Sequence, residues 1–265
     1  MSSHLPVDNR SALTNGEQPV VRRSARGLRV PPRLRGIWEN PEVVLGPLFW
    51  GLFRATTQHE RTWLYPAGPA GVSIPGIQPV RILIVGDGPA AGCGVLIHEL
   101  GIAGTLARQV AEHTGRGAVV TVIAQPDASA RSTLKRLDGV DLVGYDSVVL
   151  MLATTDVFCL TGRRSWRHSM TELVGLLTSS GAASVFVTSA ASMHLTRSLV
   201  PLARRLTGDH ARLLDTETQQ ICDLTGTQMI ALDAANDLTP RTYAKWGRRI
   251  GAHIIPFLRS SPSGW

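Results

Sequence analysis

The sequence is poor in cysteine, in aromatic residues and in long apolar runs. Its 265 residues include three cysteines, and only 5% of the chain is aromatic. Cys93, Cys159 and Cys222 are odd in number and widely spaced, which predicts neither a disulfide framework nor a C-x-x-C metal site. No apolar run reaches the roughly 20 residues of a membrane-spanning helix. We therefore expect a cytoplasmic protein without a bound metal or cofactor.

Acidic residues are scarce near the N-terminus. Residues 1–35 hold seven arginines against only Asp8 and Glu17, so this tail carries most of the formal net charge of +7. The tail lacks periodicity and contains Pro31-Pro32, which predicts a disordered basic segment. No aromatic residue is interleaved with the arginines, so we do not expect nucleic-acid binding.

Residues 36–78 are predicted to be an apolar helical segment followed by a linker. The stretch PEVVLGPLFWGLF (41–53) is strongly apolar, and its last eleven residues can form a short helix. Two interpretations remain open: the helix packs on the domain, or residues 22–54 make peripheral contact with a membrane. Residues 66–78 are rich in proline and glycine, which is typical of a linker.

Residues 79–260 alternate short apolar runs with longer amphipathic stretches. The runs are 80–85, 118–124, 147–153, 184–188 and 227–232. The expected helices lie near 95–113, 129–137, 164–179, 199–224 and 240–258. Continuous apolar, β-branched runs suit strands that are covered on both faces. The pattern therefore predicts a three-layer α/β domain with a five-stranded parallel sheet.

The loops after the strands are the expected site, because ligands of such sheets bind at the carboxyl ends of the strands. The loop after the first strand has two interpretations. Gly86-x-Gly88-x-x-Ala91 matches a dinucleotide fingerprint, and nucleotide binding by Gly86–Ala91 is one alternative. That fingerprint also needs an acidic residue at the end of the second strand, but Glu112 falls inside the preceding helix.

The other interpretation is a resemblance to a known family. VGDGPAAGCGV (85–95) resembles the first block of the SGNH (GDSL) esterases and lipases. Three further segments resemble the later blocks in order: AQPDASARSTLKRL (124–137), LATTDVFCLTGRRSWRHSMTELVGLL (152–177) and ANDLTPRTYAKWG (235–247). The resemblance implies a flavodoxin-like order of five parallel strands. It also implies ester hydrolysis or acyl transfer.

This chain departs from the family at each position where the resemblance implies catalysis. Gly88 stands at the nucleophilic serine, Asn236 at the triad aspartate and Thr239 at the triad histidine. At the oxyanion hole, Asp127 replaces a glycine and Thr155 an asparagine, while Gly88 keeps only its backbone N–H. The remaining pocket-lining positions are Asp87, Ala153, Asp156 and His194. Of these, Asp87 and Asp156 are retained family residues that we expect to be structural.

These departures predict a noncatalytic SGNH-like protein, or pseudo-esterase. Its degenerate cleft would bind a small molecule or a protein, or serve as a scaffold. The alternative is an esterase, lipase or acyltransferase with a relocated nucleophile. Cys93 is the candidate nucleophile and His194 the best candidate base. The aspartates Asp87, Asp127 and Asp156 are interpreted as helix caps and structural pairs rather than metal ligands.

Overall fold

The computed structural model describes residues 51, 64–190, 201–235 and 237–260. The predicted basic tail (1–35), most of the apolar segment before residue 64, His194 and Asn236 lie outside these described residues. The predicted membrane contact through residues 22–54 therefore remains a prediction. Among the described helices, none combines the length and apolarity needed to cross a membrane.

The predicted parallel sheet is confirmed. Its strands are β2 (Val80–Gly86), β3 (Ala118–Ala124), β4 (Ser147–Met151), β5 (Ser184–Thr188) and β6 (Gln228–Ile230). They lie in the order β3-β2-β4-β5-β6 and pair in parallel. This is the flavodoxin-like order. The strand order reverses next to β2, so a ligand site of such a sheet lies at the carboxyl ends of β2 and β4.

A sixth strand was not predicted. β1 (Gly71–Ile74) pairs with β3 in antiparallel register, Gly71 opposite Thr121 and Ile74 opposite Ala118. It lies within residues 66–78, so the linker interpretation is corrected for these four residues. The apolar residues of β1 find partners on the edge of β3, and this pairing outweighs the turn signals of the surrounding prolines and glycines.

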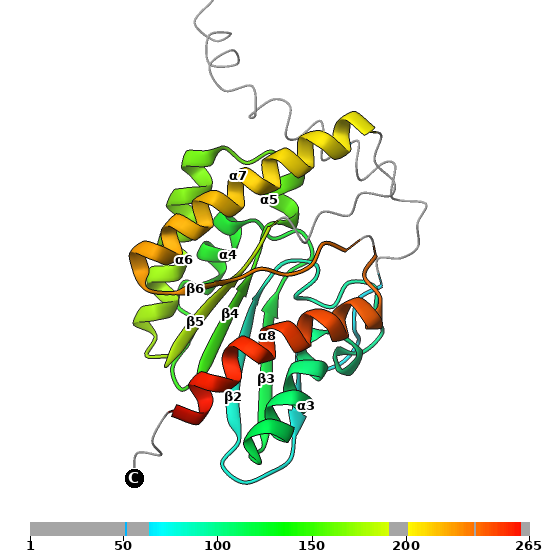
Figure 1. Ribbon diagram of the computed structural model, residues 1–265, viewed down its shortest axis with the longest axis vertical. Helices are drawn as coiled ribbons and strands as arrows, with labels where there is room; N and C mark the ends of the chain where they lie inside the picture. Colours follow the sequence, from blue (N-terminus) through cyan, green and yellow to red (C-terminus); the bar gives the residue numbers. More distant parts are fainter. Residues whose placement is uncertain (1–50, 52–63, 191–200, 236, 261–265) are drawn as a thin grey trace, which may run out of the picture.

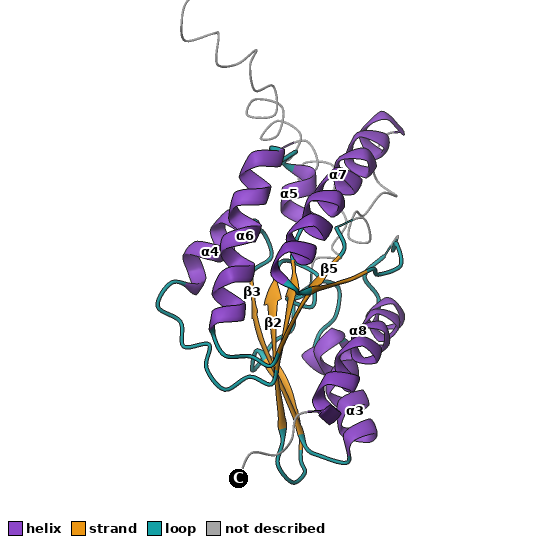
Figure 2. Ribbon diagram, turned by 60° about the vertical axis from the view of Figure 1, so that its left-hand side comes forward, coloured by secondary structure: helices purple, strands orange, loops and turns teal. Residues whose placement is uncertain are grey.

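Helices cover both faces of the sheet (Figures 1 and 2). The short 3-10 helix η1 (His98–Leu100), α3 (Ile102–Thr114) and α8 (Pro240–Ser260) lie on one face. The elements of the other face are α4 (Ala130–Leu137), α5 (Thr154–Phe158), α6 (Arg163–Ser179) and α7 (Pro201–Thr225). Alternate residues of β2 enter the two separate apolar cores, since Ile82 and Ile84 pack with α3 and α8 while Leu83 and Val85 pack beneath α4 and α6.

A buried carboxylate joins α6 to α7. Glu217 is fully buried and forms ion pairs with Arg163 and, at 2.6 Å between Nε and Oε2, with Arg167. One turn away, the indole N–H of Trp166 donates to the hydroxyl of Thr218 at 3.2 Å. These bonds fix the rotation of the two helices, because a buried carboxylate tolerates only positions where its partners reach it.

We expect Glu217→Ala to destabilise the fold. The substitution removes the shared carboxylate, but the two arginines are half exposed and regain water, so the loss should be about 2–3 kcal/mol rather than the larger values seen for fully buried pairs. Urea unfolding measures it. Asp209→Ala is the matched control, since its ion pairs on the same helix are exposed and should change stability by less than about 0.5 kcal/mol. Equal effects of the two substitutions would contradict this account.

Candidate functional site

Close packing at the end of β2 places two site loops side by side. A Cβ on Gly86 would lie 2.1 Å from the carbonyl oxygen of Met151 and 2.6 Å from the Cβ of Ala90. Only glycine can bring the backbone so near the neighbouring strand. The loop that follows β2 and the loop that follows β4 therefore leave the sheet together.

The carboxyl group of Asp87 joins these two loops. It is fully buried, and its Oδ2 accepts hydrogen bonds from the backbone N–H groups of Ala153 at 3.0 Å and Thr154 at 2.7 Å. Its Oδ1 has no partner in the described part of the chain. Burial raises the pKa of Asp87 to about 7, although the two backbone donors favour the charged form. The group acts as a clamp whose ionisation falls close to neutral pH.

Asp156 makes a second connection of the same kind. Its Oδ2 accepts from the backbone N–H of Ala130 and its Oδ1 from the hydroxyl of Thr161, both at 2.8 Å. Burial raises the pKa of Asp156 to about 6, while these two hydrogen bonds oppose the shift. The loop after β4 is thus tied to the start of α4, and both retained aspartates are engaged by neighbouring loops.

The resemblance assigns the oxyanion hole to the positions of Gly88, Asp127 and Thr155. Asp127 is exposed, and its carboxylate would repel a developing negative charge. Thr155 is buried, and no partner is found for its Oγ1 within the described chain. Ala153 has φ of 148°, a conformation that glycine adopts easily and alanine does not. The loop therefore holds an alanine in a glycine-type turn.

A segment that precedes the first strands reaches the space above Gly88. We call residues 64–70 the strap. The atoms nearest to a Cβ built on Gly88 are the carbonyl oxygen of Pro126 at 3.5 Å, the hydroxyl of Tyr65 at 3.7 Å and the Cβ of Cys93 at 3.9 Å. A small side chain fits at Gly88, and it would point towards a tyrosine hydroxyl. No histidine is among these three neighbours.

Cys93 is placed for packing rather than for attack. Its side chain is buried, and its thiol is hydrogen-bonded to the hydroxyl of Tyr65. Burial raises the pKa of Cys93 to about 11, so the thiolate that nucleophilic attack requires is absent at neutral pH. The hydroxyl of Tyr243, in α8, donates a hydrogen bond to the backbone carbonyl of Cys93. Burial also raises the pKa of Cys159 to about 11, which makes the second nearby thiol equally unreactive.

The segment that resembles the last block contributes the start of α8. Thr239 precedes α8, and its hydroxyl bonds with Asp237 and Thr242 in the same turn at 3.5 Å. This is the position of an N-terminal cap, with Pro240 as the first helical residue. The other two predicted participants of this region, His194 and Asn236, lie outside the described residues, and their roles stay predictions.

Two observations bear on the metal and dinucleotide alternatives. Within the described ranges no group of three histidine, cysteine or acidic residues could hold a metal ion, so Asp87, Asp127 and Asp156 do not converge as ligands. A dinucleotide loop needs a helix that begins directly at its glycines. Here residues 88–94 form turns, and the first α-helix after them, α3, begins only at Ile102. This geometry does not favour the nucleotide alternative, which stays a prediction.

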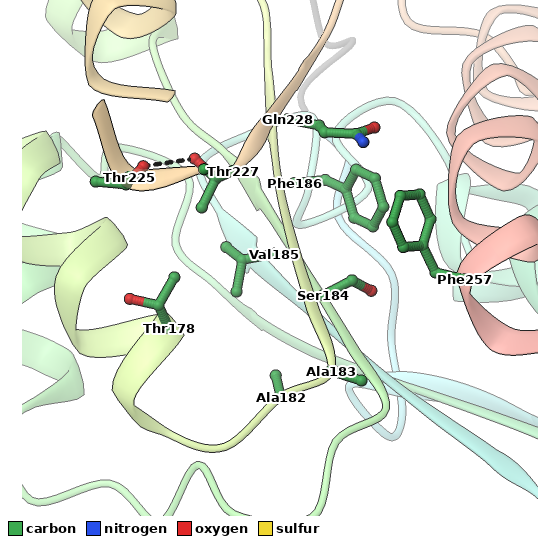
Figure 3. A pocket seen from close by; sticks show the side chains of 11 residues that line it. Thr178, Ala182, Ala183, Ser184, Val185, Phe186, Thr225, Thr227, Gln228 and Phe257 are labelled. Carbon is green, nitrogen blue, oxygen red and sulfur yellow. Dashed lines mark hydrogen bonds between the residues drawn. The ribbon is translucent and has the colours of Figure 1, made fainter. Parts of the chain in front are cut away.

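A separate hollow of about 180 Å³ lies at the opposite ends of the strands (Figure 3). It opens where β5 and β6 begin, whereas the loops of Asp87 and Thr154 follow strand ends. Phe186 and Phe257 meet edge to face there, with ring centroids 5.4 Å apart. Hydroxyl groups such as those of Thr178 and Ser184 supply its polarity, and its lining contains no acidic or basic side chain. This hollow carries no catalytic group.

Tyr65 is the site residue that sequence reasoning missed. It lies outside the four family-like segments and before the first predicted strand. Nothing in its neighbourhood in the sequence distinguishes it, because its importance comes from contact with a loop more than twenty residues further along the chain. Only the spatial return of the strap across that loop identifies it.

Comparison with solved structures identifies the fold. No protein-family model matches the sequence, and no curated protein matches it. Among solved structures, the lipase/acylhydrolase from Enterococcus faecalis aligns with a TM-score of 0.54 and 18% identity, covering 70% of this chain and 100% of its own. The structure of TesA aligns with a TM-score of 0.50 and 15% identity, covering 68% and 98%. The fold is that of SGNH-type lipases and esterases, as the resemblance implied.

The buried carboxyl of Asp87 predicts how the free energy of unfolding depends on pH. Because the pKa of Asp87 is raised to about 7, the folded protein retains a proton that the unfolded chain releases above about pH 4. The contribution of this group to the free energy of unfolding is thus full at acidic pH and is lost as the pH rises to about 7. Urea unfolding near pH 5 and near pH 8 measures the drop in the free energy of unfolding between the two. In Asp87→Asn this drop should be smaller than in the wild type by about 1–2 kcal/mol.

Asp138→Asn, at an exposed carboxyl that follows α4, is the control for this measurement and should keep the pH dependence of the wild type. An unchanged pH dependence in Asp87→Asn would show that the Asp87 carboxyl is charged in the folded protein at every pH tested.

The turn at Ala153 predicts a stabilising substitution. Holding alanine at φ 148° costs about 1–3 kcal/mol, and glycine removes this strain at a loss of about 0.5–1 kcal/mol in chain entropy. We expect Ala153→Gly to raise the free energy of unfolding by about 1 kcal/mol. Ala130→Gly, in the first turn of α4, should change it in the opposite direction. Destabilisation by both substitutions would argue against strain at Ala153.

Proposed function

We propose that this chain is a noncatalytic protein with the SGNH-hydrolase fold, whose former active-site region serves binding or scaffolding. The observation that carries the proposal is the occupancy of the nucleophile position. Gly88 offers no attacking atom, and the hydroxyl of Tyr65 stands 3.7 Å from the point where a side chain would begin. The site has kept its frame and lost the space in which an ester would react.

The size of the catalytic loss supports the proposal. Loss of a triad nucleophile or base lowers the rate by roughly 10⁶, and the residual rate depends on an intact oxyanion hole. Each missing oxyanion donor lowers it by roughly a further 10²–10³. Here Gly88 and Thr239 replace the reactive groups, and Asp127 introduces a charge of the wrong sign. A mechanism assembled from the remaining parts would have no measurable rate.

The second candidate function is hydrolysis or transfer of an acyl ester by a relocated nucleophile. It is favoured by the likeness in fold to a lipase/acylhydrolase. The hydroxyl groups near the site do not favour it. Ser129 is engaged in a capping box with Ser132 at the start of α4, where each residue's hydroxyl accepts from the other's backbone N–H. With Cys93 buried and protonated, no described thiol is activated.

The test is turnover of short-chain p-nitrophenyl esters by the full chain, together with labelling by a fluorophosphonate probe. We expect no turnover above buffer and no adduct. Gly88→Ser is the matched variant, because its Cβ meets only ordinary contacts of 3.5–3.9 Å and the fold should persist. It too should be inactive, since neither base nor oxyanion donors return with the serine. Wild-type turnover that is abolished by one substitution would establish the second candidate instead.

A further inference from the structure

The strap is fastened across the site loop by its backbone. The N–H of Gly94 donates to the carbonyl of Leu64 at 2.8 Å, and the N–H of Ala67 donates to the carbonyl of Leu96 at 3.1 Å. Tyr65 and Pro66 lie between these two bonds. At its far end, the carbonyl of Ala70 accepts from the N–H of Val122 in β3 at 2.9 Å. The strap is thus held at both ends, with Tyr65 directed into the site.

The loop beneath is shaped to receive the strap. Gly92 has φ of +80°, and a Cβ on it would lie 2.7 Å from the ring of Pro66. Any larger residue at Gly92 would therefore push the strap away. Tyr65 enters beside this contact and forms its hydrogen bond with the thiol of Cys93. Two neighbouring strap residues consequently fit two neighbouring features of the loop.

Two buried polar atoms of the loops that adjoin Gly88 lack partners among the described residues. Oδ1 of Asp87 and Oγ1 of Thr154 are both buried, and no partner for either is found within the described chain. Asp87 directly precedes Gly88, whose Cβ position lies 3.7 Å from the Tyr65 hydroxyl. Buried acceptors without partners favour an occupant that brings an O–H donor. A neutral phenol meets this requirement and carries an apolar ring as well.

We propose that Tyr65 is a built-in ligand of the space above Gly88, and that this space is a binding site for small phenols and other aryl alcohols when Tyr65 is withdrawn. The proposal rests on the proposed noncatalytic function and states what occupies its cleft. The ring of the ligand takes the place of the tyrosine ring, and its hydroxyl takes the place of the tyrosine hydroxyl beside Cys93 and the loop of Asp87.

The strap can open without unfolding the domain. Of its residues, only Tyr65 and Pro66 are half buried, and the others are exposed. Its second part borders a groove of about 430 Å³, lined also by β1 and by His98 and Glu99, so it is not tightly packed there. Exposed segments with few buried side chains open locally far more often than the core does. Exchange of Tyr65 for an external ligand is therefore compatible with an intact sheet.

Cys93 reports directly on this site, because its thiol lies beneath Tyr65. The full chain is pulse-labelled with a maleimide, and the labelled cysteines are identified by peptide mapping. In the wild type we expect slow labelling of Cys93. Tyr65→Ala should raise its rate by about tenfold or more, as expected when a local cover is removed. Cys222, buried in the other core, should stay protected and shows that the fold is intact.

Addition of p-cresol to Tyr65→Ala should restore the protection of Cys93, and toluene, which lacks the hydroxyl, should do so much less. Leu64→Ala is the control within the strap, since Leu64 is 52% exposed and its substitution should leave the labelling rate unchanged. If Cys222 becomes labelled in Tyr65→Ala, Tyr65→Phe replaces it, and faster labelling of Cys93 is again expected because the hydrogen bond to the thiol is lost.

Three results would overturn the proposal: fast labelling of Cys93 in the wild type, a rate unaffected by Tyr65→Ala or Tyr65→Phe, or equal protection by p-cresol and toluene. Ester turnover is measured on the same samples to separate the two proposals. A Cys93 result against the strap, with no turnover, leaves the noncatalytic function standing. Turnover that appears when Tyr65 is removed would refute the noncatalytic function while supporting the strap as its cover.

Discussion

The buried carboxyl of Asp87 holds the site region together. It accepts two backbone hydrogen bonds from the loop after β4, and that loop is tied in turn to α4 through Asp156. Backbone N–H groups in the interior must find acceptors, and these two side chains supply them where the strands end. Substituting either aspartate by alanine would leave buried backbone donors unsatisfied in these loops. The requirement is one of folding and is independent of any reaction.

The proposed noncatalytic function depends on this separation of folding from reaction. It requires that a nucleophilic serine and a triad histidine contribute little to stability, so that Gly88 and Thr239 can stand at their positions without loss of the fold. Thr239 has a structural use at the start of α8. The strap brings the hydroxyl of Tyr65 to 3.7 Å from the Cβ position of Gly88.

Much of this architecture is predictable from the sequence. The five parallel strands follow from continuous apolar runs, and the helices between them follow from amphipathic periodicity. β1 was missed because its four residues stand among prolines and glycines, and only pairing with β3 makes them a strand. The backbone partners of Asp87 and Asp156 could not be predicted, because they lie 66 and 26 residues away along the chain. Tyr65 was missed for the same reason, since its role arises from a contact between distant segments.

The two outermost strands have a bearing on how this protein behaves at high concentration. An unpaired strand edge is a template on which a second chain can add, and natural proteins blunt such edges by keeping them short. Here one border of the sheet is β1, with four residues, and the other is β6, with three. Neither offers a ladder long enough to nucleate cross-β growth. Without β1, the edge of β3 would expose seven residues. The pairing of β1 with β3 therefore protects the molecule from self-association.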